Sequence, residues 1–329
     1  MYQPEVYSLV LLFMIVSMFC WGSWANTLKL CPGFSFQLYY WDYVVGVLAA
    51  ACAWGVTLGS LGNSGRPFLA DIADISFRNA ALAIAGGAVF NVANLLLVAA
   101  IDIAGLAVAF PIGIGLALVV GALSNYVISP QGNPVLLFGG IALVCAAIVF
   151  DAVAYRMREQ TRTATSRRGI LISLVAGILM GCFYPFVSAA MTGARPVGPY
   201  AAVLFFAFGV ALSALPFNWL LMRKPLDGSE PTSMKMYWSA GRSPHFWGIM
   251  GGAIWCTGTV LNFVASQAHA VGPAVSYSIG QGATMVSAAW GVFVWREFAT
   301  APAAAKRFIW GMFVLFLAGL TSVALAPLF

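Results

Sequence analysis

Charged residues are scarce in this chain. Only 8% of its 329 residues are Asp, Glu, Lys or Arg, whereas 61% are hydrophobic; an average soluble domain is about a quarter charged. Most of the surface therefore cannot face water, and a lipid bilayer is the solvent that fits. Lipid offers no partner for an exposed backbone N–H or C=O group. We therefore expect an all-α polytopic membrane protein without open sheets.

The sequence also lacks the patterns that carry catalysis or metal binding. Its two histidines, His245 and His269, lie outside the centres of the hydrophobic runs, and its six cysteines form no CxxC pair. No Ser–His–Asp arrangement, Walker loop or metal-ligand spacing is present. We therefore expect no enzyme, no metal and no cofactor, and we interpret the cysteines as small buried hydrophobic residues.

Hydrophobic runs predict ten transmembrane helices. A spanning helix needs about 20 apolar residues, and runs of that length occupy 7–27, 38–61, 80–101, 104–127, 135–154, 169–190, 199–222, 246–268, 271–295 and 307–327. The longest connections, at about 62–79, 155–168 and 223–245, are polar and are predicted as loops. The opening residues MYQPEV are acidic where a signal peptide needs basic residues, so no signal peptide is expected.

The basic residues predict the orientation. Arg66, Arg78 and Arg195 fall on one side of the predicted spans, and the rest of the 16 Lys and Arg residues fall on the other. Basic loops stay in the cytoplasm, so we expect a multi-pass protein of the cell (inner) membrane with both termini outside. The topology accounts for the net charge of +6, and no nucleic-acid partner is implied.

Three stretches of the chain occur twice, in the same order. MFCWGSW (18–24) returns as MGCFYPF (180–186), IAGGAVF (84–90) as IMGGAIW (249–255), and GLAVAFPIGIG (105–115) as GPAVSYSIGQG (272–282). This indicates a duplicated five-helix unit, 1–155 and 169–329, joined by a basic cytoplasmic linker at 156–168. Five is odd, so the second copy enters the membrane from the opposite face. Such inverted repeats are typical of secondary transporters, which bind substrate near the midplane.

Small and helix-breaking residues recur in these repeats. Glycines on one helix face let neighbouring helices pack closely in lipid. The glycines expected to do so are Gly105, Gly113, Gly272 and Gly280. Pro111 and Pro185 each remove a hydrogen bond inside a core helix, and we predict either a static kink or a gating bend there.

Polar residues that break the repeat are the candidates for substrate binding, because an asymmetric solute needs an asymmetric pocket. Gln281 stands where the first copy has Ile114, and Asn91 and Asn94 share one face without an amide counterpart in the second copy. Helix–helix hydrogen bonding is the alternative for these amides, and core packing the alternative for the aromatic residues. The predicted substrate-binding set is Trp21, Trp24, Asn26, Asn91, Asn94, Tyr184, Tyr277 and Gln281.

Asp42 is the one carboxylate a turn inside a predicted span. A desolvated carboxyl group can hold a proton, so Asp42 is the candidate for proton coupling. The alternative is an interfacial acid paired with Lys29 or a loop arginine. Asp151 ends the fifth span close to Arg156 and is interpreted as structural.

Several stretches of this chain resemble the ureide permease family. They are WGSWANTLKL (21–30), FQLYYWDY (36–43), FNVANLLL (90–97), GLAVAFPIGIG (105–115) and VFVWREF (292–298). The resemblance implies a place near the glucose/ribose porters in the drug/metabolite transporter superfamily, whose ureide permeases in plants are proton-coupled importers of allantoin and nucleobases. The loop at 155–168 is short, unlike the long cytoplasmic loop of the plant members.

The residues and the resemblance together favour a secondary active transporter. We expect proton-coupled uptake, by symport and alternating access, of a small neutral polar solute such as a ureide, nucleobase or sugar. The partners implied are that solute, H+ and the lipid bilayer, with a homo-oligomer left open. A multidrug exporter of the same superfamily, with a wide Met- and Phe-rich pocket, is one alternative, and a membrane scaffold or sensor is the other.

Overall fold

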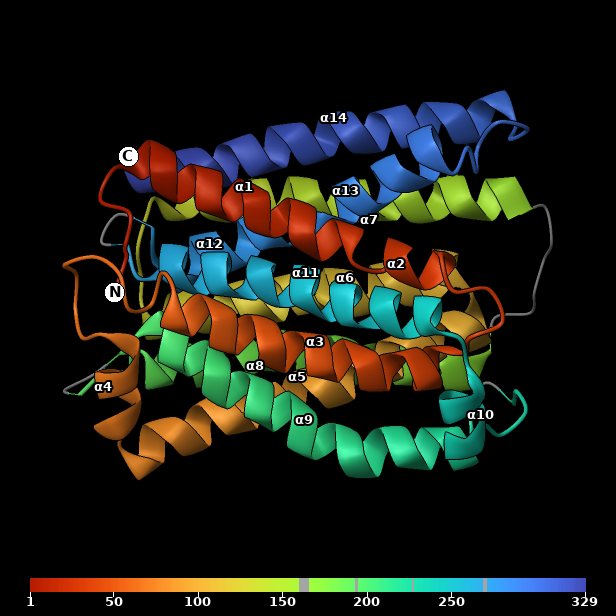
Figure 1. Cartoon of the computed structure of the whole chain (residues 1–329). Helices are drawn as coiled ribbons and strands as arrows, with labels where there is room; N and C mark the ends of the chain where they lie inside the picture. The colour runs from red at the N-terminus through yellow and green to blue at the C-terminus, as the bar shows by residue number, and fades with distance from the viewer. Residues whose placement is uncertain (160–165, 193–194, 227, 269–270) are drawn as a thin grey trace.

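The computed structural model is helical, without strands, over the residues that it describes: 1–159, 166–192, 195–226, 228–268 and 271–329 (Figure 1). Among the described residues, eight helices are long and apolar enough to cross a membrane. They are α1 continued by α2 (Tyr7–Ser23, Asn26–Lys29), α5 (Phe77–Ala104), α6 (Leu106–Ile128), α7 (Pro134–Glu159), α8 (Arg167–Ala190), α9 (Pro199–Arg223), α11 (Arg242–Ser266) and α14 (Ala303–Leu325).

Two of the ten predicted spans differ from these eight. The run at 38–61 forms α3 (Phe36–Val56), a 21-residue helix whose first half is made polar by tyrosines and Asp42. The run at 271–295 is not one continuous helix. It divides into α12 (Gly272–Gly280), α13 (Ala283–Ala289) and the π-helical turn η1 (Trp290–Val294), and glycines stand on both sides of Gln281 where the helix breaks.

The connections predicted as loops contain short helices. These are α4 (Phe68–Ala73) and α10 (Met234–Ser239), and the chain ends in the 3-10 turn η2 (Ala326–Leu328). The side chains of Ser76 and Ser233 cap α5 and α10 by accepting backbone N–H bonds, as serine does at helix starts. Residues 160–165 of the linker predicted at 156–168 lie outside the described residues.

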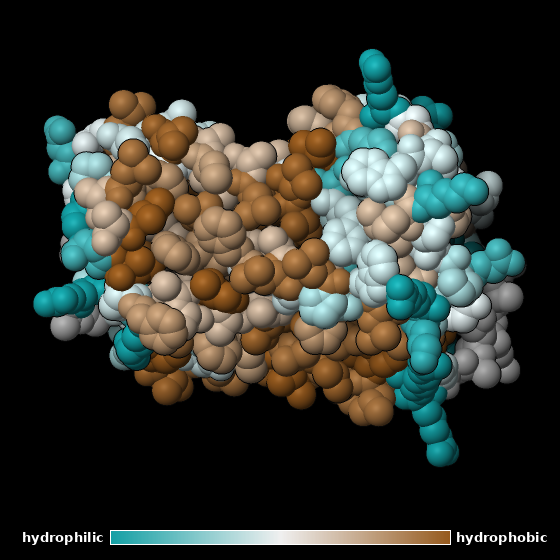
Figure 2. Space-filling view, turned by 60° about the horizontal axis from the view of Figure 1, so that its bottom comes forward, coloured by the Kyte–Doolittle hydropathy of each residue, from teal (hydrophilic) through white to brown (hydrophobic). Residues whose placement is uncertain are grey.

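Both chain termini lie at one end of the bundle, and α2 and α10 lie at the other (Figure 1). The Met1 amino group donates to the Ser64 carbonyl at that first end. Figure 2 shows hydrophobic side chains across the middle of the visible face and polar ones gathered toward both ends. The surface and the eight apolar helices together define a multi-pass membrane protein.

Glycines allow two helix crossings to bring backbone against backbone. Gly46 and Gly252 lie where α3 crosses α11, and Gly87 and Gly209 lie where α5 crosses α9. At each of the four positions, an added Cβ atom would overlap a carbonyl oxygen of the facing helix. Close approach of this kind is how small residues associate helices in lipid.

The glycines predicted to pack on helix faces divide into two kinds. Gly113 and Gly280 are close to other side chains: an added Cβ would lie 2.6 Å from Leu97 and 2.5 Å from the ring of Trp21. The prediction is wrong for Gly105, which has no atom within 4 Å of its Cβ position and connects α5 to α6 with a φ of 79°. Gly272 begins α12 with a φ of 70° and is also closely packed, because an added Cβ would overlap the Gln131 side chain. Glycine adopts such positive φ values without steric cost.

The two predicted prolines lie inside long helices. Pro111 is in α6 and Pro185 is in α8. A gating bend of the helix at either proline stays a prediction.

Candidate functional site

A cavity of about 320 Å³ lies in the middle of the bundle. Four of the predicted substrate-binding residues line it: Trp21, Trp24, Asn94 and Gln281. Its lining continues to Leu28 in α2, near the end of the bundle that carries most of the basic residues. The volume is at the small end of the range for ligand pockets, roughly 300–1,000 Å³.

Two helix breaks form part of the cavity wall. One lies between α1 and α2, at Trp24 and Ala25, and the other between α12 and α13, at Gln281 and Gly282. Trp24, Ala25 and Gln281 all line the cavity. Irregular backbone at membrane depth is tolerated where it is buried in protein or lines a cavity, and interrupted helices commonly form the binding sites of transporters.

The amides at the cavity wall can bind a neutral solute. The Asn94 amide nitrogen donates to the Tyr40 hydroxyl at 3.3 Å, and Tyr40 donates to the Asn91 side-chain oxygen at 2.8 Å. These two hydrogen bonds fix the orientation of the Asn94 side chain. The Gln281 carboxamide makes no hydrogen bond to another described residue, so its donors and acceptor face the cavity unpaired. None of the described residues that line the cavity is charged.

Stacked aromatic rings form another part of the wall. Phe90 stacks on Trp255 with ring centroids 4.5 Å apart, and Trp21 also stacks with Trp255 at a centroid distance of 6.3 Å. Phe183 meets Phe90 edge to face at 5.3 Å. Analysis of the sequence selected Trp21 but missed Phe90, Phe183 and Trp255. The signal was present, since Phe90 and Trp255 end the repeated stretches IAGGAVF and IMGGAIW.

The other predicted residues lie beyond the cavity lining and have protein partners. Tyr184 donates to the Asn262 side-chain oxygen at 2.8 Å, and Tyr277 donates to the Ala117 carbonyl at 3.1 Å. Both tyrosines are fully buried. Asn91 is also buried and holds Tyr40, whereas Asn26 accepts a hydrogen bond from the indole of Trp295. In this conformation these four side chains do not line the cavity but form hydrogen bonds with neighbouring parts of the protein.

Asp42 is buried and has two close partners. The Tyr237 hydroxyl donates to one carboxylate oxygen at 2.6 Å, and the Nδ1 atom of His245 lies 2.8 Å from the other. The alternative that pairs Asp42 with Lys29 or a loop arginine is therefore wrong. Burial, reinforced by the hydrogen bond and charge of Asp42, raises the pKa of Tyr237, which keeps this hydroxyl a donor. No pattern in the sequence indicated Tyr237, which lies in a segment predicted as a loop.

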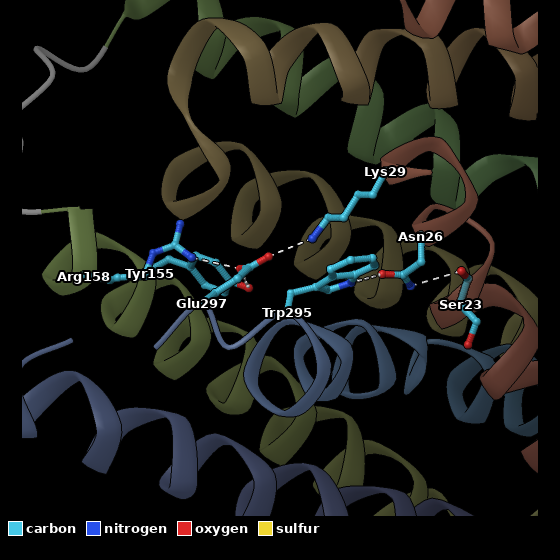
Figure 3. A network of polar contacts seen from close by, with 7 residues as sticks. All are labelled: Ser23, Asn26, Lys29, Tyr155, Arg158, Trp295 and Glu297. Carbon is cyan, nitrogen blue, oxygen red and sulfur yellow. Dashed lines mark hydrogen bonds and ion pairs between the residues drawn. The ribbon is translucent and has the colours of Figure 1, made fainter. Parts of the chain in front are cut away.

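A polar network at the same end joins α2, α7 and the segment after η1 (Figure 3). Glu297 accepts from Lys29 at 2.7 Å through one oxygen, and from Arg158 at 2.9 Å and Tyr155 at 3.1 Å through the other. Burial alone would raise the pKa of Glu297, but the hydrogen bond and charge of Lys29, with those of Tyr155 and Arg158, hold it below its usual value. Glu297 is therefore ionised at neutral pH.

The network continues to the break between α1 and α2. The indole N–H of Trp295 donates to Asn26 at 2.6 Å, and Asn26 donates to the Ser23 carbonyl at 3.1 Å. The Lys29 ammonium also lies over the Trp295 ring, 5.0 Å from its centroid. These contacts connect the helix break that lines the cavity with Glu297 (Figure 3).

A bundle of membrane helices that encloses an uncharged, solute-sized cavity between interrupted helices is the arrangement of a membrane transporter. The chain belongs to the sugar transport protein family, whose family model matches residues 43–326.

Curated relatives agree with this assignment and confirm the resemblance to ureide permeases. Ureide permease 4 of Arabidopsis thaliana is 23% identical, and the match covers 93% of this chain and 94% of the relative. Ureide permease 1 of the same plant is also 23% identical, over 91% of this chain and 92% of the relative. These relatives are permeases, so the chain is a transporter of small solutes and not an enzyme.

A solved structure supports the fold. It is described only as a crystal structure of a protein, is 16% identical, and superposes with a TM-score of 0.63 over 96% of both chains. At this identity the likeness concerns the fold alone.

Proposed function

We propose that this protein is a secondary active transporter that takes up a small neutral polar solute together with protons. It works by alternating access between two inverted five-helix halves, 1–155 and 169–329, and the solute binds in the central cavity. Membership of a transporter family gives the class; the arrangement of the cavity wall supports the rest.

One observation carries this proposal: equivalent residues of the repeat meet at the cavity. Phe90 and Trp255 occupy the same position of the repeated stretches, and their rings stack on each other at 4.5 Å. A residue that touches its own equivalent lies beside the axis that relates the two halves. Two further equivalent pairs, Trp21 with Phe183 and Ile114 with Gln281, also line the cavity. A pseudo-two-fold axis through the binding site is typical of inverted-repeat transporters.

Backbone features repeat in the same way. The crossing that uses Gly46 and Gly252 has its counterpart in the crossing that uses Gly209 and Gly87, with α3 corresponding to α9 and α11 to α5. Gly105 and Gly272, which begin the repeated stretches GLAVAFPIGIG and GPAVSYSIGQG, share a positive φ. These corresponding backbone features support a common fold for the two halves of the chain.

The symmetry gives the buried tyrosines a role in transport. Tyr277 corresponds to Phe110, and Tyr184 to Gly22, and both counterparts line the cavity. If the halves exchange conformations, Tyr184 and Tyr277 face the solute when the cavity opens toward the other side of the membrane. Different members of the predicted substrate-binding set would then contact the solute in the two conformations of the protein.

The cavity chemistry favours a neutral polar solute over the alternatives. The amides of Asn94 and Gln281 offer donors and acceptors to an amide or hydroxyl group, and Trp21 and Trp24 offer flat faces to a ring. A phosphorylated or multiply charged solute would find no charged partner among the described lining residues. An exporter of apolar cations would have little use for unpaired amides, and a static scaffold would need no pair of interconvertible halves.

Proton coupling is assigned to Asp42. Its carboxyl group is buried beside His245, and it lies two residues after Tyr40, which holds the cavity amide Asn94. Helix α3 thus connects a proton-binding group with the solute site.

Counterflow tests the proposed function. Proteoliposomes of the purified protein are loaded with unlabelled allantoin, uracil or glucose, and entry of the labelled solute is followed. We expect transient accumulation with at least one of the three. Absence of counterflow with all of them, together with protection of cells against cationic dyes, would favour the exporter.

Replacement of Gln281 should weaken solute binding without unfolding the protein. The change Gln281→Ile installs the residue found at the equivalent position, Ile114, and removes the unpaired carboxamide from the cavity. A lost hydrogen bond costs on the order of 1 kcal/mol, more when a buried solute group is left unpaired. Affinity should therefore fall by roughly fivefold or more. Normal binding to the purified variant would assign Gln281 to helix packing.

The orientation can be tested with a reporter that is active only in the cytoplasm. We expect a fusion after Phe329 to be silent, because the termini lie at the end opposite to most of the basic residues and basic loops stay in the cytoplasm. A fusion after Lys224, at the basic end of α9, serves as the active control. A bright signal from the Phe329 fusion would reverse the orientation.

A further inference from the structure

Asp151 is a carboxylic acid buried in a membrane helix, and it has no hydrogen-bond or ion-pair partner among the described residues. Only 4% of the residue is exposed, and its Oδ1 atom has no hydrogen-bond partner among the described residues. Asp151 lies close to Arg156 in the sequence, but the Arg156 side chain is exposed and forms no hydrogen bond or ion pair with Asp151. An unpaired charge in such a position is costly, and ionisable residues inside membranes are usually functional.

The groups next to Asp151 on α7 belong to the Glu297 network. Tyr155 and Arg158 follow it by one and two turns, which places all three on one face of the helix. Side chains on a helix lean toward its N-terminus, so Tyr155 leans toward the turn that carries Asp151. Yet both Tyr155 and Arg158 bind Glu297 (Figure 3).

Among the described residues, no other nearby cation forms a hydrogen bond or ion pair with Asp151. The ionisable groups on the packed elements are Tyr155 and Arg158 of α7, Arg296 and Glu297 after η1, Lys306 and Arg307 of α14, and Lys29 of α2. Lys29 binds Glu297, Lys306 donates to the Ala299 carbonyl at 3.0 Å, and Arg296 is exposed. Helix α6, which also packs on α7, has Tyr126 near its far end as its sole ionisable residue. Arg307, like Arg296, is exposed. None of these cations is paired with Asp151 among the described residues.

We propose that Asp151 is a second proton-binding site, separate from Asp42, and that Tyr155 couples it to the Glu297–Lys29 ion pair. With a proton on Asp151, Tyr155 gives its single hydroxyl hydrogen to Glu297, as the structure has it. When Asp151 releases that proton to water at the basic end, the new carboxylate competes for Tyr155 and Arg158. Glu297 then loses donors that stabilise its charge and faces a second negative charge. Both changes favour uptake of a proton by Glu297, and a protonated Glu297 no longer forms an ion pair with Lys29.

The ion pair acts on the wall of the cavity. Lys29 directly follows Leu28, which lines the cavity in α2. Release of Lys29 removes one of the contacts that hold α2 to the segment after η1, another being the hydrogen bond from Trp295 to Asn26, so the proton on Asp151 favours the conformation seen here. This consequence rests on the proposed function, whereas proton binding by Asp151 does not.

Infrared spectroscopy of the purified protein, without solute, tests proton binding directly. We expect the carbonyl stretching band of a protonated carboxylic acid at neutral pH. Labelling of aspartate side chains with ¹³C should shift this band. The band should be lost in Asp151→Asn and retained in Asp42→Asn. An aspartate band of unchanged intensity in Asp151→Asn, or a wild-type protein without such a band, would overturn the proposal.

A second variant keeps the test decisive if Asp151→Asn does not fold. In Asp151→Glu the band should become insensitive to aspartate labelling and sensitive to glutamate labelling. A band that stays with aspartate in this variant contradicts the assignment. Because no solute is present in these infrared measurements, they are independent of the counterflow experiment. A failure of counterflow would refute transport but would not affect the test of proton binding by Asp151.

Discussion

Gly252→Leu should prevent this protein from folding, or destabilise it by about 3 kcal/mol or more, the upper range for overpacked cores. A Cβ at this position overlaps the Tyr43 carbonyl oxygen where α3 crosses α11. The obstacle is backbone, so no rotamer change relieves it and the two helices must separate. The yield of monodisperse protein in size-exclusion chromatography and its melting temperature measure the effect.

The matched control is Gly139→Leu. Gly139 is an exposed glycine of helix α7 with no atom within 4 Å of its Cβ position, so this variant should be as stable as the wild type or more so, because leucine favours helix over glycine. Gly87→Leu, at the equivalent crossing of α5 and α9, should be as damaging as Gly252→Leu. A mild effect at either crossing position would contradict the backbone contact there.

Asp42→Asn should abolish proton-driven accumulation while leaving exchange intact. Asparagine has the shape of aspartic acid and still offers an oxygen to the Tyr237 hydroxyl, so the fold should survive. It carries no titratable proton, however, and cannot link solute movement to a pH gradient. Uptake into proteoliposomes under an imposed gradient should fall to the equilibrium level, and counterflow without a gradient should continue.

Asp42→Glu is the control, since it keeps a carboxyl group and should retain part of the gradient-driven uptake. Accumulation by Asp42→Asn at the wild-type level would exclude Asp42 from coupling. Loss of both accumulation and counterflow, in a protein with a normal melting temperature, would instead assign Asp42 to the transport cycle as a whole.

Composition and periodicity are sufficient to predict the helical architecture, because lipid leaves few alternatives for the backbone. They are less informative where a helix is interrupted. Gln281 was predicted inside a continuous span, yet it ends α12, because Gly280 and Gly282 beside it lower the cost of a break. Gly105 was predicted on a helix face, although its φ of 79° makes it a connector. The local sequence pattern cannot distinguish a glycine that packs between helices from a glycine that connects two helices with a positive φ.

The candidate site was partly predictable for a related reason. Asymmetry between the repeats selected Gln281 and Asn94, which line the cavity, whereas the aromatic pair of Phe90 and Trp255 was missed because it is nearly symmetric. The partners of Asp42 were missed because His245 and Tyr237 come from distant parts of the chain. Their proximity is a property of the tertiary fold.

The most direct test of alternating access is the two-sided accessibility of one residue in the cavity. Ala283 begins α13 at the cavity wall, and Ala283→Cys in a cysteine-free background provides a single thiol. Membrane-impermeant reagents are added to right-side-out and to inside-out vesicles, with and without a transported solute. We predict labelling from both sides, and slower labelling from each when solute is bound. Labelling from one side only under every condition would contradict two interconverting halves around a central site.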